Sequence, residues 1–283
     1  MQKSNSFYKN YELIDCGDFK KLESFSGVVV QRPAPQADFS KVLPDNVWNS
    51  ASAIFDGKEW AINDQKILDG WTSKIDTATI ELKTSTGGQV GIFPEQAINW
   101  SWLKEAVNRG GKTLNIFNGF GYTGLSTIFA SSPTSNVCHV DASKSAVTWA
   151  KKNSQLSGVT SNNIRWIVDD VITFLKRDVK RGVKYDGFIL DPPAFGRGKD
   201  GKTWSLKRDI DALLYISSTL LSDNPAFFVL TCHDHEMTAK ELGVLLGKVD
   251  KTFRGKMEVF EMLIQATSGN VLKSGLCARV KLF

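Results

Sequence analysis

The chain is predicted to be an α/β protein with a doubly wound, mostly parallel sheet, preceded by a smaller β-rich N-terminal module. Two observations predict this fold class. From about residue 112 onward, short apolar runs alternate with segments of helical character, as in the βα units of a parallel sheet. The first apolar run leads into a glycine-rich turn within Lys112–Thr127, KTLNIFNGFGYTGLST. A strand, a tight glycine turn and a helix start bring backbone N–H groups close to a bound nucleotide.

The composition is that of a globular protein, with 42% hydrophobic and 23% charged residues among 283. This length favours two domains, which we place at residues 1–93 and 94–283. A polar N-terminus without a secretory signal, and apolar runs too short to cross a bilayer, lead us to expect a cytoplasmic protein. The cysteines form no CxxC pair, which indicates free thiols and no metal site: Cys16, Cys138, Cys232 and Cys277.

Positive charge is concentrated in one part of the chain. Between Lys176 and Arg208 there are ten Lys or Arg residues and four Asp residues, whereas the net charge of the whole chain is only +5. A basic zone beside an active site suits a polyanionic substrate such as RNA. A solvated helix face followed by a loop explains the same charges, and the sequence does not decide between the two.

The N-terminal module is expected to contain short strands at 11–15, 28–31 and 77–83, separated by turns rich in Gly, Pro and Asp. Its large aromatic residues follow no helical period: Trp48, Phe55, Trp60 and Trp71. Packing in a core is the favoured use of these rings, and a base-stacking surface is the alternative.

The second part begins with an expected helix over Pro94–Arg109. Five strands of the predicted parallel sheet follow, at 114–117, 137–140, 164–168, 186–190 and 226–231. The helices between and after them are expected near 124–131, 143–156, 170–181, 207–221 and 237–248. Two last strands, 257–266 and 276–283, are expected to close the sheet as an antiparallel pair.

The glycine turn has the spacing G-x-G-x-x-G at Gly119, Gly121 and Gly124, which is weak evidence by itself. Its weight rises because Asp141 closes the next strand, where a carboxylate can accept hydrogen bonds from both hydroxyls of a ribose. The alternative for Asp141 is a helix N-cap.

The third strand ends in Asp169 and Asp170, where a carboxylate can accept a hydrogen bond from an adenine amino group. Asp170 is the preferred residue of the two. Capping of the following helix explains Asp170 equally well.

The fourth strand ends in Asp191, Pro192 and Pro193, and Phe195 follows. Two prolines cannot continue a sheet ladder, so the backbone must leave the strand rigidly at its carboxyl end. Such an exit would hold Asp191 and the 193–195 backbone against the reactive end of a cofactor and a flat substrate. The basic loop behind it would clamp a phosphate or lie exposed without a contact.

Four segments together resemble motifs of class I S-adenosylmethionine-dependent methyltransferases: LNIFNGFGYTG, VDASKSAVTWAKKN, IRWIVDDVITFL and LDPPAFGRG. The group that the chain most resembles is the bacterial 23S ribosomal RNA cytosine-5 methyltransferases and their relatives. GIFPEQAIN (Gly91–Asn99) resembles that group's G-x-F-x-D-Q-R-x-N segment, which lies over the cofactor, with Glu95 in place of Asp and Ala97 in place of Arg. The likeness covers about residues 89–283.

The resemblance implies a seven-stranded methyltransferase-type sheet and S-adenosylmethionine as the cofactor. It implies cofactor contacts from Phe93, Gln96, Asn118, Gly119, Gly121, Tyr122, Thr123, Gly124, Asp141, Ala142, Ser143, Asp169, Asp170, Asp191, Pro192 and Pro193. Asp191 would lie near the donor methyl group. The substrate contacts expected with these are Phe195, Arg197 and Lys199.

Two details bear on the atom that is methylated. Ala194 stands between the prolines and Phe195, which makes methylation of an exocyclic amine less favoured. Methylation at C5 of cytosine needs a thiolate that attacks C6, and Cys232 at the end of the fifth strand is the candidate. A buried structural cysteine is the alternative. The nearby His233 and His235 would polarise a substrate or titrate near neutral pH.

The sequence therefore predicts an S-adenosylmethionine-dependent methyltransferase of a base in RNA, with ribosomal RNA as substrate, catalytic residues Asp191 and Cys232, and no metal. The alternatives are a methyltransferase of a protein or small molecule, an NAD-dependent oxidoreductase with the same glycine turn, and a non-catalytic RNA-binding module. The oligomeric state is open, a homodimer included. All of this requires the turn after Phe117 and the exit after Leu190 to open into one cavity.

Overall fold

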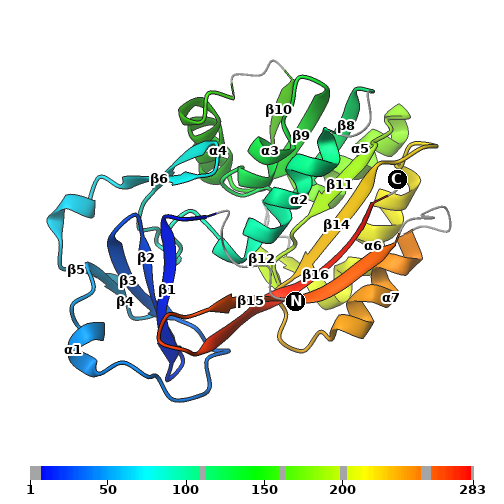
Figure 1. Cartoon of the computed structure of the whole chain (residues 1–283). Helices are drawn as coiled ribbons and strands as arrows, with labels where there is room; N and C mark the ends of the chain where they lie inside the picture. Colours follow the sequence, from blue (N-terminus) through cyan, green and yellow to red (C-terminus); the bar gives the residue numbers. More distant parts are fainter. Residues whose placement is uncertain (1–7, 109–111, 160–162, 198–202, 250–255, 282–283) are drawn as a thin grey trace. The chain divides into compact units, whose positions relative to one another are not determined.

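The computed structural model describes residues 8–108, 112–159, 163–197, 203–249 and 256–281, and the chain divides into two compact units (Figure 1). The first unit comprises Met1–Ile98, Leu156–Gly158 and Met262–Ser274, and the second comprises Asn99–Gln155, Val159–Glu261 and Gly275–Phe283. Both units therefore contain segments that are far apart in the sequence. The division into residues 1–93 and 94–283 as folding domains stays a prediction.

A seven-stranded sheet with the order β10-β9-β8-β11-β14-β16-β15 frames the second unit. Its strands are β8 (Leu114–Gly119), β9 (Ser135–Asp141), β10 (Ile164–Val168), β11 (Gly187–Leu190), β14 (Phe227–Cys232), β15 (Met257–Gln265) and β16 (Val271–Lys281). The first five in this spatial order pair in parallel, and β16 runs antiparallel to β14. The predicted doubly wound, mostly parallel fold class is confirmed.

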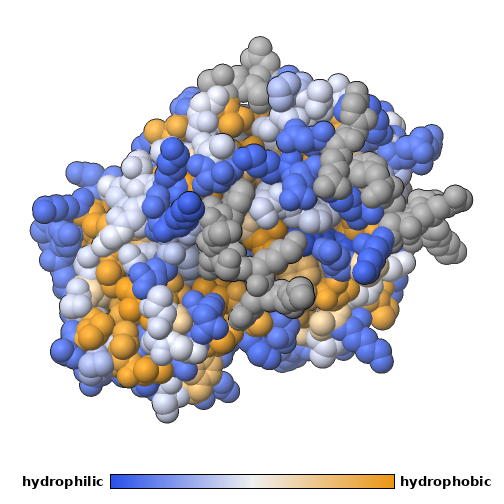
Figure 2. All heavy atoms as spheres, in the orientation of Figure 1, coloured by the Kyte–Doolittle hydropathy of each residue, from blue (hydrophilic) through white to orange (hydrophobic). Residues whose placement is uncertain are grey.

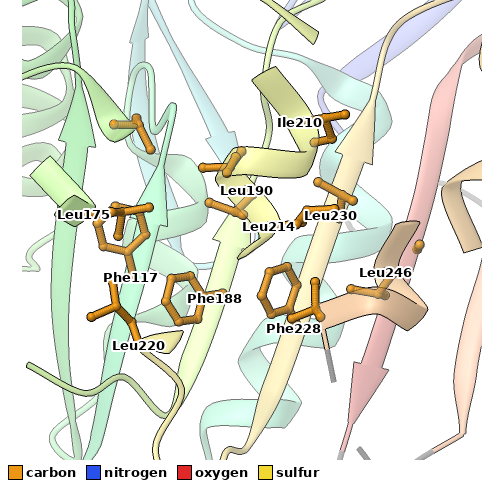
Figure 3. Close-up of a cluster of buried hydrophobic side chains, with 14 of the residues drawn as sticks. Phe117, Leu175, Phe188, Leu190, Ile210, Leu214, Leu220, Phe228, Leu230 and Leu246 are labelled. Atoms are coloured by element: carbon orange, nitrogen blue, oxygen red, sulfur yellow. The ribbon is translucent and has the colours of Figure 1, made fainter. Parts of the chain in front are cut away.

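Helices cover both faces of this sheet. They are α2 (Ala97–Val107), α3 (Leu125–Ala130), α4 (Lys144–Leu156), α5 (Val171–Arg181), α6 (Leu206–Thr219) and α7 (Ala239–Val249). Side chains of α5, α6 and α7 form one core with Phe117, Phe188 and Phe228 of the central strands, all fully buried (Figure 3). Trp102 of α2 instead contacts Phe227, the strand neighbour of Phe228, at 5.8 Å between ring centroids. Since successive strand residues point to opposite faces, α2 lies on the other side of the sheet.

The first unit contains a five-stranded sheet with the order β1-β2-β3-β4-β5 and a separate hairpin of β6 and β7. The strands are β1 (Tyr11–Gly17), β2 (Lys20–Phe25), β3 (Val28–Pro33), β4 (Ala53–Phe55), β5 (Trp60–Ile62), β6 (Trp71–Ile75) and β7 (Ala78–Leu82), with a short helix α1 (Asp45–Trp48). Figure 2 shows hydrophobic and hydrophilic residues side by side on one face of the molecule.

Aromatic packing in the first unit follows the favoured expectation. Trp48 and Phe55 are buried, and the Phe55 ring packs on Trp60 at 5.1 Å. The indole N–H groups of Trp60 and Trp71, which are half-buried, donate to backbone carbonyl oxygens. These rings are therefore used for packing within the unit.

The carboxylate of Asp15 is fully buried in the first unit and accepts five hydrogen bonds. Its donors are the N–H groups of Cys16, Val42 and Leu43, the indole of Trp48 and the hydroxyl of Ser268, at 2.6–3.2 Å. A buried carboxylate is stable only when neighbouring donors replace its hydration. Asp15 thus joins β1 to the 42–48 segment and to the turn between β15 and β16.

Several elements were missed by the sequence reading. β2 follows β1 through a two-residue turn in which Asp18 and Phe19 both have positive φ, 51° and 60°. Neither residue is the glycine that usually marks such a turn, so the sequence signal for it is weak. The basic loop after β11 also contains a hairpin, β12 (Phe195–Arg197) with β13 (Thr203–Ser205). Within the described part of the chain, no helix is long and apolar enough to span a membrane.

We expect Asp15→Asn to lower the free energy of unfolding by about 3 kcal/mol, because an amide nitrogen would face buried donors that lose their acceptor. Chemical denaturation of the full chain measures this. The matched control is Asp38→Asn, an exposed carboxylate in the same unit, which should change stability by less than about 0.5 kcal/mol. Equal effects of the two substitutions would contradict the role given to Asp15.

Candidate active site

The glycine turn and the proline exit leave the sheet at the same edge. β8 and β11 are parallel neighbours, and Gly119 pairs with Leu190 in register. Both segments therefore leave the sheet at the same edge, as the expected common cavity requires, and the cavity itself stays a prediction. From β8 the chain adds β9 and β10 on one side, and β11 and β14 lie on the other, so β8 and β11 flank the point where strand order reverses. Open α/β sheets bind ligands at the carboxyl ends of strands at such a switch point.

The glycine turn has an unusual backbone. Phe120, Tyr122 and Gly124 have φ values of 58°, 46° and 88°. The turn is closed by hydrogen bonds from Gly121 N–H to the Val140 oxygen (3.2 Å) and from Gly124 N–H to the Gly121 oxygen (3.0 Å). Left-handed conformations in bulky residues are strained and gather at functional sites, which fits the position of this turn.

Packing inside the protein also requires the glycines. A Cβ atom on Gly121 would lie 2.4 Å from the ring of His139, and one on Gly124 would lie 2.8 Å from the Cβ of Ala150 in α4. Both contacts are closer than non-bonded carbon atoms tolerate. The glycines of the motif thus allow the turn to pack closely against β9 and α4. They would also allow a ligand to approach the backbone closely.

Asp141 connects the ends of β8 and β9. One carboxylate oxygen accepts from the Tyr122 N–H (2.9 Å) and the other from the Ser143 N–H (2.8 Å). Burial raises the pKa of Asp141, and these two hydrogen bonds oppose that shift. The cap of α4 is Ser143, whose hydroxyl accepts from the Ala146 N–H. The ribose contact of Asp141 stays a prediction.

Both carboxylates that follow β10 already accept hydrogen bonds within the protein. Asp170 caps α5 by accepting from the Thr173 N–H at 2.8 Å, so the capping alternative is confirmed for this residue. Asp169 accepts from the Asp170 N–H and forms an ion pair with Arg177. An adenine contact from either residue remains a prediction.

A buried polar chain supports the glycine turn from inside. Asn118 Nδ2 donates to Thr127 Oγ1 (2.7 Å), which lies 2.9 Å from His139 Nδ1. All three side chains are almost fully buried. Burial lowers the pKa of His139 to about 3, so its ring is neutral at physiological pH. The Asn118 amide and the His139 ring thus hold the turn in place.

At the exit from β11, Asp191 is held by the end of β14. Its Oδ1 accepts from the Thr231 hydroxyl and lies 3.0 Å from His233 Nε2. The side chains of Asp191 and His233 are 27% and 26% exposed. The exit therefore presents a fixed and partly accessible carboxylate.

Trp204 connects this exit to the glycine turn, and the sequence reading missed it. Its indole N–H donates to the Pro193 oxygen at 2.6 Å, and its ring lies 4.9 Å from the ring of Phe120. The next carbonyl, of Ala194, accepts from the Leu206 N–H at 3.0 Å. The only signal in the sequence is an aromatic residue that follows a polar loop and precedes an amphipathic helix.

Phe195 is 61% exposed just beyond this anchored backbone. An exposed aromatic ring on a rigid segment suits stacking on a flat substrate. Arg197 lies in β12, where only its backbone is described, and Lys199 is outside the described residues. Their substrate contacts stay predictions.

Cys232 is buried, at 1% exposure, in the core formed with α6 and α7. Burial is the main cause that raises the pKa of its thiol to about 11. The thiol is therefore protonated at neutral pH, which favours the structural alternative over a nucleophile.

The remaining predicted cofactor contacts differ in exposure. Thr123 and Pro192 are buried, Ala142 is half-buried and Pro193 is exposed, all at the ends of these strands. Phe93 (half-buried) and Gln96 (buried) belong to the first unit, and their cofactor contacts stay predictions. No cluster of three metal-ligating side chains occurs among the described residues.

The basic zone lies only partly beside the site. α5 begins where β10 ends, with Asp170 as N-cap, and ends at Gly182 just before β11 begins. Its 11 residues span about 16 Å, so Lys180, Arg181 and Lys184 lie toward the opposite edge of the sheet. For this part of the zone the alternative of a solvated helix face is favoured, because a crossover helix runs back to the amino ends of the strands.

The comparisons with known proteins agree with this geometry. No protein-family model matches the chain. A solved structure, the SAM-dependent methyltransferase from Agrobacterium tumefaciens, is 33% identical with a TM-score of 0.91, over 98% of this chain and 91% of that one.

Two relatives are named as enzymes of ribosomal RNA. Ribosomal RNA large subunit methyltransferase I of Aeromonas salmonicida is 32% identical over 40% of this chain and 28% of its own length. Ribosomal RNA large subunit methyltransferase K/L of Buchnera aphidicola is 28% identical over 52% of this chain and 20% of its own length. The chain thus spans less than a third of the length of each of these two relatives.

The buried His139 gives a prediction on pH. Since the folded state keeps the ring neutral while the unfolded chain takes up a proton below its ordinary pKa of 6.5, stability falls as pH falls. Between pH 7 and 5 we expect a loss of about 2 kcal/mol relative to His139→Gln. Urea denaturation at a series of pH values measures both proteins, and the same pH slope in both would contradict this.

We expect Trp204→Phe to weaken binding of S-adenosylhomocysteine about tenfold in calorimetry, because the Pro193 carbonyl loses its donor and the two loops are less well joined. Trp100→Phe is the matched control. Trp100 is also buried, donates to Ser126 and stacks on Phe129, but lies in α2. Equal losses of affinity in the two variants would mean that Trp204 acts through general stability alone.

Proposed function

The chain belongs to the S-adenosylmethionine-dependent methyltransferases, and we propose that it transfers a methyl group from this cofactor to a base of large-subunit ribosomal RNA. Family membership removes the NAD-dependent oxidoreductase alternative. The observation that carries the proposal is the register of Gly119 with Leu190, which joins a nucleotide-type turn and the Asp191 exit at one sheet edge.

The residues at this edge fit the cofactor. The strained turn at Phe120–Gly124 would lie against the methionine part, and Asp141 stands at the next strand end for the ribose. Asp170 or Asp169 would face the adenine. Asp191, Pro192 and Pro193 would face the reactive end of the cofactor, its sulfonium methyl group. When bound, S-adenosylmethionine supplies an electrophilic methyl group on a sulfonium sulfur.

The chain's own contribution is alignment. A displacement at carbon needs the incoming atom, the methyl group and the sulfur in line, and fixed geometry can lower the barrier by several kcal/mol. The anchored Pro193–Ala194 backbone provides a rigid edge for this, with Phe195 exposed beside it for stacking. A base within an RNA helix would have to be flipped out to reach it.

An RNA substrate is supported by the names of the relatives and by the exposed aromatic ring. Lys176 in α5 and the basic residues of the 197–202 loop would contact phosphates, and the first unit would help to hold the RNA. Such an enzyme would act in the cytoplasm, and it is expected to need no metal. Its oligomeric state, monomer or homodimer, is to be measured by light scattering.

The direct test is mass spectrometry of ribosomal RNA nucleosides from cells with and without the gene. One methylated nucleoside should disappear in the deletion and return with the wild-type gene. An unchanged set of nucleosides would refute ribosomal RNA as the substrate.

We expect Asp191→Ala to lower methyl transfer by at least about 100-fold, because the carboxylate at the reactive end is lost, while affinity for S-adenosylhomocysteine changes only a few-fold. Transfer of a labelled methyl group and calorimetry measure the two quantities. Asp211→Ala, an exposed carboxylate on α6, is the control and should keep both. Normal turnover in Asp191→Ala would remove the residue from the site.

A further inference from the structure

The Asp191 carboxylate is oriented by a side chain at the end of β14, Thr231, and by His233 just after this strand. Leu190 pairs with Leu230 in register, so Asp191 and Thr231 each follow a paired residue at the same edge. Thr231 and His233 both bond to the same oxygen, Oδ1 of Asp191, with 3.0 Å to His233 Nε2. An oxygen with two fixed partners keeps the plane of the carboxylate constant.

We propose that Asp191, held in place by His233 and Thr231, accepts the proton of the substrate atom that receives the methyl group. The acceptor would then be a nitrogen or oxygen atom that carries hydrogen, and not a carbon atom activated by Cys232. This inference rests on the proposed methyl transfer and specifies the class of acceptor atom.

The side chains that would carry the two alternative mechanisms, proton acceptance by Asp191 and nucleophilic attack by Cys232, lie toward different faces of β14. Phe228, Leu230 and Cys232 alternate with Thr231 along the strand, and these three belong to the core shared with α6 and α7. Successive strand side chains point to opposite faces, so the Cys232 sulfur points into that core while Thr231 bonds to Asp191. A thiolate nucleophile needs an accessible and ionised sulfur, and Cys232 is 1% exposed with a raised pKa of about 11.

The exit geometry also bears on Ala194, which had weighed against a nitrogen acceptor. The carbonyl groups of Pro193 and Ala194 are both anchored, by Trp204 and by the Leu206 N–H. Phe195 nevertheless projects at 61% exposure directly after them. The inserted alanine therefore still leaves an exposed ring four residues after Asp191 for a flat substrate.

The proposed methyl transfer from sulfur to the acceptor atom moves two electron pairs and one proton. A lone pair of the acceptor atom forms the new bond to the methyl carbon, and the electrons of the broken carbon–sulfur bond remain on sulfur, which becomes a neutral thioether. The proton of the acceptor atom passes to the Asp191 carboxylate and from there to water. Asp191 is the catalytic residue, whereas His233 and Thr231 are positioning residues.

The first experiment separates positioning by His233 from general stability. His233→Gln keeps an N–H donor near the position of Nε2, and His233→Leu has none. We expect kcat to fall about 100-fold in His233→Leu and less than about tenfold in His233→Gln, with KM for RNA and affinity for S-adenosylhomocysteine changed less than threefold. Asp211→Ala, at an exposed position on α6, should behave as wild type. Equal kcat in His233→Leu and wild type would overturn the inference.

The second experiment identifies the acceptor atom. Wild-type enzyme and labelled S-adenosylmethionine are added to extract of gene-deleted cells, and the labelled product is analysed by mass spectrometry. Methyl on a nitrogen or oxygen atom that carried hydrogen supports the inference. Methyl on carbon, on sulfur or on a ring nitrogen without hydrogen overturns it. Label in protein or in a small molecule refutes the proposed RNA substrate, yet the methylated atom still tests the inference.

Cys232→Ala completes the test, since it removes the sulfur from a buried site. We expect it to retain at least about half of the wild-type kcat after correction for the folded fraction, because the sulfur takes no part in the step. A variant that binds S-adenosylhomocysteine normally and transfers no methyl would overturn the inference, while leaving the proposed function intact.

Discussion

The parallel pairing of β8 with β11 is the constraint on which the rest of the site depends. Because Gly119 is in register with Leu190, the residues that follow each strand must leave from the same edge. The strand order reverses between these two strands, so the connections after them run to opposite sides and leave their ends accessible. A shift in this register would separate the glycine turn from Asp191, whatever their sequences.

The site is then made rigid by contacts of three kinds. Close packing of Gly121 on His139 and of Gly124 on Ala150 fixes the turn against β9 and α4. Buried hydrogen bonds from Asn118 through Thr127 to His139 support it from within. Trp204 joins the turn to the exit through Phe120 and the Pro193 carbonyl. Fixed geometry of this kind is what a displacement reaction requires from a protein.

Much of the second unit could be predicted because its strands are buried on both faces and read as short apolar runs between helices. The expected strand at 137–140 is observed as Ser135–Asp141, and the expected helix at 143–156 as Lys144–Leu156. The first unit was harder, since strands such as Ala53–Phe55 are only three residues long and pair with a strand far away in the sequence, Val28–Pro33. Local patterns contain no information on such pairing.

The candidate site residues differ in the same way in how far the sequence predicts them. Asp141 and Asp191 could be proposed because they follow apolar strands, whereas the contacts of Trp204 are not revealed by any local spacing. The reversal of a crossover helix already places Lys180 and Arg181 away from the site, and this could have been predicted. The surroundings of the Cys232 thiol could not, because β14 is buried on both faces and only the structure shows that the thiol lies in the core with α6 and α7.

A crystal structure of the protein with S-adenosylhomocysteine tests the central claim most directly. The cofactor product should lie across the ends of β8 and β11, with its ribose hydroxyls bonded to Asp141 and its sulfur on the Asp191 side. A ligand bound at another edge of the sheet, or one whose sulfur points away from Asp191, would contradict the account.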